Sequence, residues 1–258
     1  MKQTIIKAAS ASGNLLMKHF SKKLIIKKKS KKDIVTNADI EAERIILKIL
    51  MKKFPKFNYY SEEKGSINNN SNYTWIIDPL DGTVNYANKI PIFTTSIALK
   101  HKNEIILAVT YAPYLKELYY AEKGKGSFLN NKKIFVSKKP KLNCCISSLS
   151  SGTKTKEKTR VMKSIYNIVL PKSKNLIMLN STTLTLAYTA SSRIDNFISY
   201  HTSIENIAAG ILLVKEANGL VTDFKGNTFN IDKDLNMVAS NGKIHKELLK
   251  IIKKVKIK

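Results

Sequence analysis

The sequence predicts an α+β fold, with layers of helices and sheets divided into two lobes. Segments with helical spacing alternate with segments of strand character along the whole chain, with neither an internal repeat nor a long linker. With 258 residues, 43% of them hydrophobic, the chain is long enough for a sizeable core. We therefore expect an N-terminal lobe at residues 1–140 and a C-terminal lobe at 141–258, packed as one compact unit with its seam near Pro140.

The N-terminal half should begin with two helices and continue as strands. Apolar residues at helical spacing predict one helix across 5–16 and a second across 40–50, with Thr36 or Asn37 as its N-cap. The polar run at 66–72 reads as a loop, and the turn of a later hairpin is expected at Asn130 and Asn131. The expected strands are 75–78, 94–100, 104–111 and 117–122, followed by the hairpin 124–137.

The C-terminal half mixes the two patterns more closely. Asn218-Gly219 is a typical helix stop after the run IAAGILLVKEA. The expected helices are 155–169, 181–192, 207–217 and 245–255, and the expected strands are 195–199 and 219–224.

Composition bounds the class of protein. No apolar run approaches membrane-spanning length, and no apolar segment with a cleavage site opens the chain, so we expect a cytoplasmic protein without membrane insertion. The only cysteines, Cys144 and Cys145, are adjacent and cannot form a structural disulfide framework. The net charge of +26 is compatible with a nucleic-acid partner, but the lysines are scattered along the chain, which favours a solvated, lysine-rich surface.

The strongest functional signal is the segment WIIDPLDGTVNY. Asp78 is expected to end an apolar strand, Asp81 follows three residues later, and Thr83 adds a hydroxyl. Carboxylates this close to a strand end converge on one point, and Mg²⁺ prefers hard oxygen ligands. Glu62, in the upstream loop SEEKG, supplies a further carboxylate. Taken alone, DPLDG is equally compatible with a plain reverse turn.

The wider sequence resembles a known family. DIVTNAD, SEE, WIIDPLDGTVNY, GKGSF and IAAGILLVKEANG occur in the order found in the inositol monophosphatase family, which includes bacterial members of the extragenic-suppressor type. The resemblance covers nearly the whole chain. It implies the five-layer αβαβα sandwich of the inositol monophosphatase and fructose-bisphosphatase fold, a homodimer, and Mg²⁺ ions between the two lobes.

The resemblance also implies roles for individual residues. Glu62 and Asp78, with the backbone carbonyl of Leu80, would hold a first Mg²⁺, and Asp78 with Asp81 would help to hold a second. Thr83 and Glu62 would orient the attacking water. Asp33 would lie behind the ligands without touching the metal. The residues implied to contact the substrate are Leu80, Asp81, Gly82, Thr83, Ser181 and Asn206.

Two positions depart from the family pattern. The family places Trp-Asp before its conserved helix and uses the aspartate as a ligand for the second metal, but this chain has Glu205 and Asn206 there. Asn206 would be a weak ligand without charge, or it would only cap the helix. Glu205 would need a shifted helix start to replace it, since successive helical side chains point about 100° apart. The family's inositol-binding glutamate corresponds to Ser199.

These residues predict Mg²⁺-dependent hydrolysis of a small phosphate monoester, inositol-1-phosphate or a similar sugar phosphate. Paired cations neutralise the charge of the phosphate and activate a water molecule, so no covalent enzyme intermediate is needed. Activity would be reduced if Asn206 is a poor ligand. The alternatives are a weakly catalytic or non-catalytic partner of the transcription and RNA machinery, and a sister phosphatase that acts on nucleotide 3′-phosphates or fructose bisphosphate.

Overall fold

The computed structural model describes residues 1–30, 33–151 and 155–255, and for 28–30, 33 and 151 it describes the backbone only. The α-helices are α1 (Lys2–Phe20), α2 (Asn37–Lys53), α3 (Thr83–Ala87), α4 (Lys156–Val169), α5 (Thr182–Ala190), α6 (Ile204–Glu216) and α7 (His245–Ile252). The strands of the N-terminal half are β1 (Ile26–Ser30), β2 (Asp33–Thr36), β3 (Asn58–Ser61), β4 (Gly65–Ile67), β5 (Tyr73–Asp81), β6 (Thr94–His101), β7 (Glu104–Ala112), β8 (Glu117–Glu122), β9 (Gly126–Leu129) and β10 (Lys132–Ile134). Those of the C-terminal half are β11 (Ile146–Ser151), β12 (Asn175–Ile177), β13 (Asn196–Tyr200), β14 (Leu220–Thr222) and β15 (Met237–Ser240).

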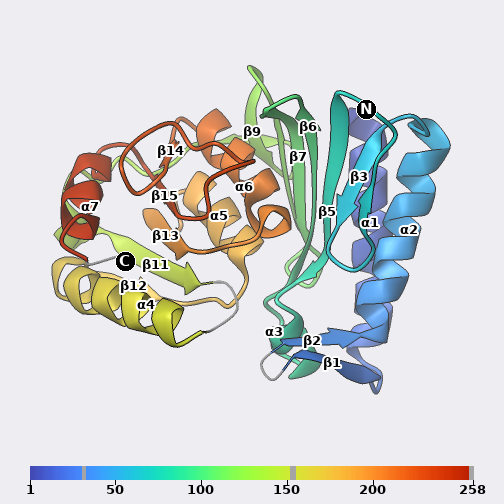
Figure 1. The fold of residues 1–258 in the computed structure, drawn as a ribbon, viewed down its shortest axis with the longest axis horizontal. Coiled ribbons are helices and arrows are strands. Elements are labelled where there is room, and N and C mark those ends of the chain that lie inside the picture. Colours follow the sequence, from blue (N-terminus) through green and yellow to red (C-terminus); the bar gives the residue numbers. More distant parts are fainter. Residues whose placement is uncertain (31–32, 152–154, 256–258) are drawn as a thin grey trace.

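Five layers stack across the molecule (Figure 1). Helices α1 and α2 cover the outer face of an eight-stranded sheet, in the order β10-β9-β8-β7-β6-β5-β3-β4. Helices α5 and α6 lie between this sheet and a five-stranded sheet, in the order β12-β11-β13-β15-β14, whose outer face is covered by α4 and α7. The predicted αβαβα sandwich is therefore confirmed. None of the helices among the described residues is long and apolar enough to cross a membrane.

The middle layer joins the two sheets into one core. Helix α6 packs against β5 to β8 on one side and β14 and β15 on the other, so it has apolar residues all round and is almost wholly buried. Gly210 allows α5 to approach closely, because a Cβ atom there would lie 2.4 Å from that of Leu186. The start of α6 is thereby fixed between the lobes, where the site described below lies.

Most predicted elements are present, with instructive differences. Thr36 caps α2 as predicted, and Asn130 and Asn131 have positive φ at the hairpin turn. The loop predicted at 66–72 is wrong in part, because 66–67 belong to β4. Strands β11, β12 and β15 were not predicted from their short patterns; β11, ISSLSS, is rich in serine, a residue common in turns. The large sheet ends at Ile134 and the small one starts at Ile146, while the division at Pro140 stays a proposal.

Candidate active site

A bulge in β5 brings Asp78 and Asp81 to one side of the large sheet. Asp78 pairs with Ser96 and Asp81 with Thr94, so three steps along β5 oppose two along β6. An extra residue of this kind bends a strand and redirects its side chains. Both carboxylates are buried, with 1% and 6% exposure. The expectation that the strand ends at Asp78 was wrong, since β5 continues through the bulge to Asp81.

The turn after Asp81 requires glycine. Gly82 has φ of +87°, in the left-handed region, and a Cβ atom there would lie 2.8 Å from the backbone oxygen of Ile92. Because Gly82 permits this turn, α3 begins at the next residue, Thr83. The hydroxyl of Thr83 is thereby placed to donate towards the backbone carbonyl of Leu80 in the bulge (3.0 Å).

Asp81 is held by the beginning of α5. Its carboxylate accepts hydrogen bonds from the Ser181 hydroxyl, from the backbone N–H groups of Thr182 (3.2 Å) and Thr183 (2.9 Å), and from the Thr183 hydroxyl (2.8 Å). Burial raises the pKa of Asp81, and the hydrogen bonds from Ser181 and Thr183 oppose that shift. The structure thus brings together Asp81 and Ser181, two of the predicted substrate residues from different lobes.

Glu62 lies in a turn that two other elements hold in place. The Oε1 atom of Glu43, on α2, accepts hydrogen bonds from the backbone N–H groups of Glu63 (3.1 Å) and Lys64 (3.0 Å). The N–H of Glu62 itself donates to the carbonyl of Ile77 on β5 (3.3 Å). Glu43, which sequence reasoning did not single out, therefore positions the Glu62 turn next to the strand that carries Asp78.

Asp78 lies in a field of negative charge. Its burial raises its pKa well above the usual value, and the charges of Glu62, Asp81, Glu205 and Asp39 add to the effect, in that order. Its own Oδ1 accepts a hydrogen bond from the backbone N–H of Leu80 (3.1 Å). These acidic groups come from four separate segments of the chain, and their charges act on one buried carboxylate.

Sequence reasoning missed Asp39. It is the third residue of α2 and completes a capping box with Thr36, and its Oδ1 lies 3.3 Å from the Thr83 hydroxyl. Burial raises the pKa of Asp39 to about 6, against the lowering effect of its hydrogen bonds with Thr36. The T-x-x-D spacing in DIVTNAD signals the cap but not the contact with Thr83. The prediction named Asp33 instead, whose side chain lies outside the described residues.

Asn206 touches both carboxylates of the bulge. With its NH₂ group directed at them, the amide donates to Asp81 Oδ1 (3.1 Å) and Asp78 Oδ2 (3.3 Å), and its oxygen accepts from Ser203 Oγ (2.6 Å). The reverse orientation would set the amide oxygen against two carboxylate oxygens. The alternative in which Asn206 caps α6 is wrong, because the N-cap is Ser203 and the helix starts at Ile204.

Ser199, which the resemblance aligns with the family's inositol-binding glutamate, lies on β13. It is fully buried, and its Oγ has no hydrogen-bond partner within the part of the chain that the structure describes. Serine is much shorter than glutamate and carries no charge. The structure therefore gives no sign that Ser199 replaces the glutamate as a ligand for inositol.

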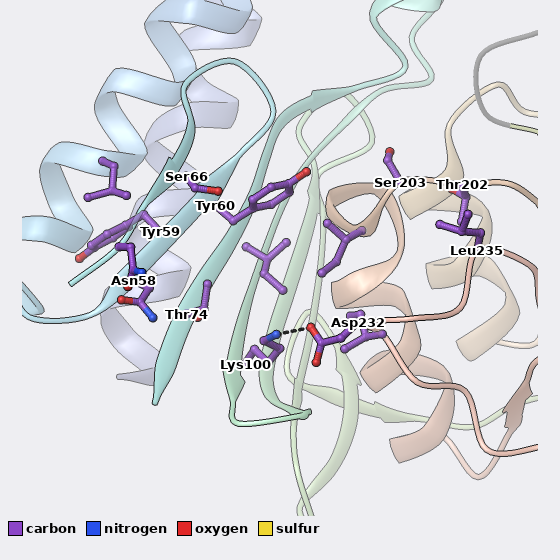
Figure 2. Close-up of a pocket in the computed structure, with 15 residues that line it drawn as sticks. Asn58, Tyr59, Tyr60, Ser66, Thr74, Lys100, Thr202, Ser203, Asp232 and Leu235 are labelled. Carbon is purple, nitrogen blue, oxygen red and sulfur yellow. Dashed lines mark hydrogen bonds and ion pairs between the residues drawn. The ribbon is translucent and has the colours of Figure 1, made fainter. Parts of the chain in front are cut away.

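An inter-lobe pocket of about 580 Å³ borders the acidic groups without including them. Figure 2 shows Tyr60 pointing from β3 towards the C-terminal lobe, where Thr202 and Ser203 lie on the far side, and an ion pair between Lys100 and Asp232 on the wall. Tyr60 stands two residues before Glu62 and Ser203 two before Glu205. The pocket is therefore a space beside the candidate site, lined by polar and apolar side chains.

The acidic side chains of the site have the negative charge and the oxygen atoms that a hard divalent cation prefers. They are not yet arranged around one point as metal ligands. Within 1–30, 33–151 and 155–255, no three Asp, Glu, His or Cys side chains already form a ligand group for a metal ion. One reason is that Asp78 and Asp81 are engaged with protein donors, including the Asn206 amide. In contrast, Oε2 of Glu205 is buried without a hydrogen-bond partner among the same residues. Binding of a cation would therefore require side chains to turn towards it.

Known proteins match this chain over nearly its full length. A fructose-1,6-bisphosphatase/inositol-1-monophosphatase of Thermotoga maritima is 38% identical over 251 residues, covering 97% of this chain and 94% of that protein. The Nus factor SuhB of Xylella fastidiosa is 36% identical over 226 residues, covering 86% and 81%. The crystal structure of extragenic suppressor protein SuhB from Bartonella henselae superposes with a TM-score of 0.93, at 33% identity and 98% coverage of both chains. The model of the inositol monophosphatase family matches residues 1–256, and the chain belongs to that family.

Proposed function

We propose that the chain is a Mg²⁺-dependent phosphatase that hydrolyses a small phosphate monoester, inositol-1-phosphate or a similar sugar phosphate. The observation that supports this most is the gathering of acidic charges around Asp78, beside the Thr83 hydroxyl. Family membership and relatives named as inositol-1-monophosphatases support the same reaction class. Glu62, Asp78, Asp81 and the Leu80 carbonyl would hold the cations. When bound, Mg²⁺ would neutralise the phosphate and lower the pKa of a water molecule.

Thr83, with its hydroxyl hydrogen directed towards the protein, would orient the attacking water, and Asp39 would help to hold that hydroxyl. The single hydroxyl hydrogen of Thr83 has two acceptors, Asp39 Oδ1 at 3.3 Å and the Leu80 carbonyl at 3.0 Å. With that hydrogen turned to the protein, the oxygen lone pairs are left to accept a hydrogen bond from water. The water oxygen then forms a bond to phosphorus as the ester P–O bond breaks, and inorganic phosphate and an alcohol are released. Glu62 would help to orient the same water.

Substrate contacts are assigned to the bulge and the start of α5. The backbone at Gly82 and Thr83 would face the phosphate, and Asp81 with Ser181 would lie at the alcohol side, with Leu80 and Asn206 beside them. Thr182 and Thr183 are bulkier than the small residues usual in the family here. A site with these threonines, and with serine in place of the glutamate at position 199, would therefore suit a sugar phosphate other than inositol phosphate.

A phosphate-release assay tests this function. Inositol-1-phosphate, fructose 1,6-bisphosphate and a nucleoside 3′-phosphate are offered with Mg²⁺ and with EDTA, to the wild type and to Asp78→Asn. We expect release of phosphate from a sugar phosphate only with Mg²⁺, and at least a 100-fold loss in Asp78→Asn. Equal rates for the wild type and Asp78→Asn would contradict the assignment, and a preference for the nucleotide or for fructose 1,6-bisphosphate would favour the sister-phosphatase alternative.

A second function, contact with the transcription machinery, is favoured by relatives named Nus factor SuhB and by the net charge of +26. It would not need the carboxylates. Retention on RNA polymerase that is unchanged in Asp78→Asn and persists at 300 mM salt would support it. Retention on every nucleic acid that disappears at modest salt would be a general effect of positive charge.

Two further assignments follow the family. We propose a homodimer, to be tested by light scattering of the purified chain, and a cytoplasmic location, to be tested by fractionation. The division into an N-terminal lobe at 1–140 and a C-terminal lobe at 141–258 is proposed with them. A monomer at micromolar concentration would contradict the dimer without affecting the chemistry.

A further inference from the structure

Glu205 is a buried carboxylate for which the protein supplies too few donors. It is the second residue of α6, and only 8% of it is exposed. Its Oε2 is buried without a hydrogen-bond partner in the described ranges, and no ion pair within those ranges involves it. A buried carboxylate oxygen without a donor costs free energy, since water no longer solvates it. This oxygen is therefore suited to bind something that the chain alone does not provide.

The neighbours of Glu205 are those of the candidate metal site. Its negative charge acts on Asp78 and on the Tyr60 hydroxyl, and the charge of Glu62 acts on the same two groups. Glu205 and Glu62 therefore both lie close enough to Tyr60 and Asp78 for their charges to act on the same two groups. A divalent cation is the natural counter-charge for acidic side chains gathered in this way.

The start of α6 explains how two successive residues reach this region. Because the helix begins at Ile204 after the N-cap Ser203, both Glu205 and Asn206 are in its first turn. Asn206 points to Asp78 and Asp81. Glu205 points about 100° away from it around the helix axis, and its charge acts on Tyr60 as well as on Asp78. The two successive residues thus both act on Asp78, Asn206 through a hydrogen bond and Glu205 through its charge.

We infer that Glu205 is a ligand for a divalent cation in this chain, and that it supplies from one residue earlier the charge that Asn206 lacks. Asn206 has a different role, in which its NH₂ group holds Asp78 and Asp81 close together before the cation binds. The inference rests on the proposed function, because it assigns a new ligand to the same site. The residues that would hold the cation are then Glu205, Glu62 and Asp78.

Calorimetric titration of the full chain with Mg²⁺, and with Mn²⁺ as a second probe, tests the inference. Glu205→Gln keeps the size of the side chain and removes its charge, and we expect it to weaken binding at least tenfold, which is about 1.4 kcal/mol. Glu104→Gln is the matched control, because Glu104 is an exposed carboxylate paired with Lys123. It should bind both cations as the wild type does. In the Glu205→Gln background, Asn206→Asp should restore part of the lost affinity.

Thermal unfolding separates a ligand from a structural carboxylate. In EDTA, Glu205→Gln should unfold at the wild-type temperature or above it, because it removes an unsatisfied charge, while the stabilisation by Mg²⁺ should shrink. A lower unfolding temperature in EDTA for Glu205→Gln than for Glu104→Gln would overturn the inference. So would wild-type cation binding in Glu205→Gln when Asp78→Asn has lost it, and the proposed function would then stand. Unchanged binding in both variants would overturn the function as well.

Discussion

The bulge at 78–83 and the start of α6 at 203–206 meet at one place but are stabilised in opposite ways. In the bulge, Asp81 accepts four hydrogen bonds from the beginning of α5. At the start of α6, Glu205 has a buried oxygen without a donor among the described residues. Hydrogen-bond donors of the protein itself thus stabilise the bulge, whereas the start of α6 would be stabilised most by a ligand that binds to Glu205. Variants at Gly82 and Thr83, which are not proposed cation ligands, should change folding and rate, whereas variants at Glu205 and Asn206 should change cation affinity.

The largest effect is expected for Thr83→Val, which has nearly the same shape but no hydroxyl. Without an acceptor for the hydrogen of the water, the phosphatase rate should fall about 10³-fold, roughly 4 kcal/mol. Thr83→Ser keeps the hydroxyl and should retain most of the rate. Calorimetry should give wild-type Mg²⁺ affinity for both. A rate for Thr83→Val within threefold of the wild type would remove Thr83 from the reaction.

The next effect concerns Asp39 and pH. The pKa of Asp39 is raised to about 6, so its contribution to the free energy of unfolding is complete below pH 4 and is lost as pH rises through 6. The shift from 3.8 corresponds to about 3 kcal/mol. Urea unfolding in EDTA should therefore show the stability of the wild type falling relative to Asp39→Asn between pH 4 and 7.

Activity should depend on pH in the opposite direction. Ionised Asp39 accepts hydrogen bonds from Thr36 and Thr83 at its two oxygens, whereas protonated Asp39 would have to donate at one of them, so the phosphatase rate should rise as pH rises through about 6. Asp39→Asn should be slower and should lack that step in its pH profile. A wild-type pH profile in the variant would show that another group controls the rate.

Gly82→Ala should destabilise folding through the geometry of the bulge. An L-residue at φ of +87° is strained, and its Cβ would lie 2.8 Å from the Ile92 oxygen. Gly65 has a similar φ of +73° but open space around the added atom, so Gly65→Ala reports the strain alone. We expect about 1 kcal/mol for Gly65→Ala and about 2 kcal/mol more for Gly82→Ala in urea unfolding. Equal losses of stability in the two variants would show that α3 and the bulge can shift at little cost to make room for the added atom.

The sequence predicted the residues of the bulge better than the contacts that other segments make with them, and the cause is the separation of the residues along the chain. Asp78, Asp81 and Thr83 lie within six residues, so a turn and a strand suffice to bring them together, and the sequence indicates both. Asp39 and Thr83 are 44 residues apart, and their contact depends on how α2 packs against β5. Such a contact is a tertiary property, and the T-x-x-D spacing is already fully explained by the helix cap.

The start of α6 was harder to predict, because a shift of the first helical residue by one position decides which side chain faces the site. The sequence analysis placed the helix after Asn206, which left Glu205 outside it and left Asn206 as either a weak ligand or a cap. The structure starts the helix at Ile204, so both residues enter its first turn. Helix boundaries are uncertain by one or two residues even with good caps. At 3.6 residues per turn, that uncertainty is enough to change the assigned role of a residue.

The smallest effect is expected for Asn206→Asp. The variant replaces the donor that bridges Asp78 and Asp81 with a third negative charge, so in EDTA its free energy of unfolding should fall below that of the wild type. A cation would then neutralise one more charge, and the Mg²⁺ concentration for half-maximal rate should fall several-fold, about 1 kcal/mol. A lower stability in EDTA together with a higher affinity for Mg²⁺ distinguishes an amide that bridges the two carboxylates from one that contacts neither. If neither the stability in EDTA nor the Mg²⁺ dependence moves, Asn206 has no part in the site and the comparison between its two halves rests on Glu205 alone.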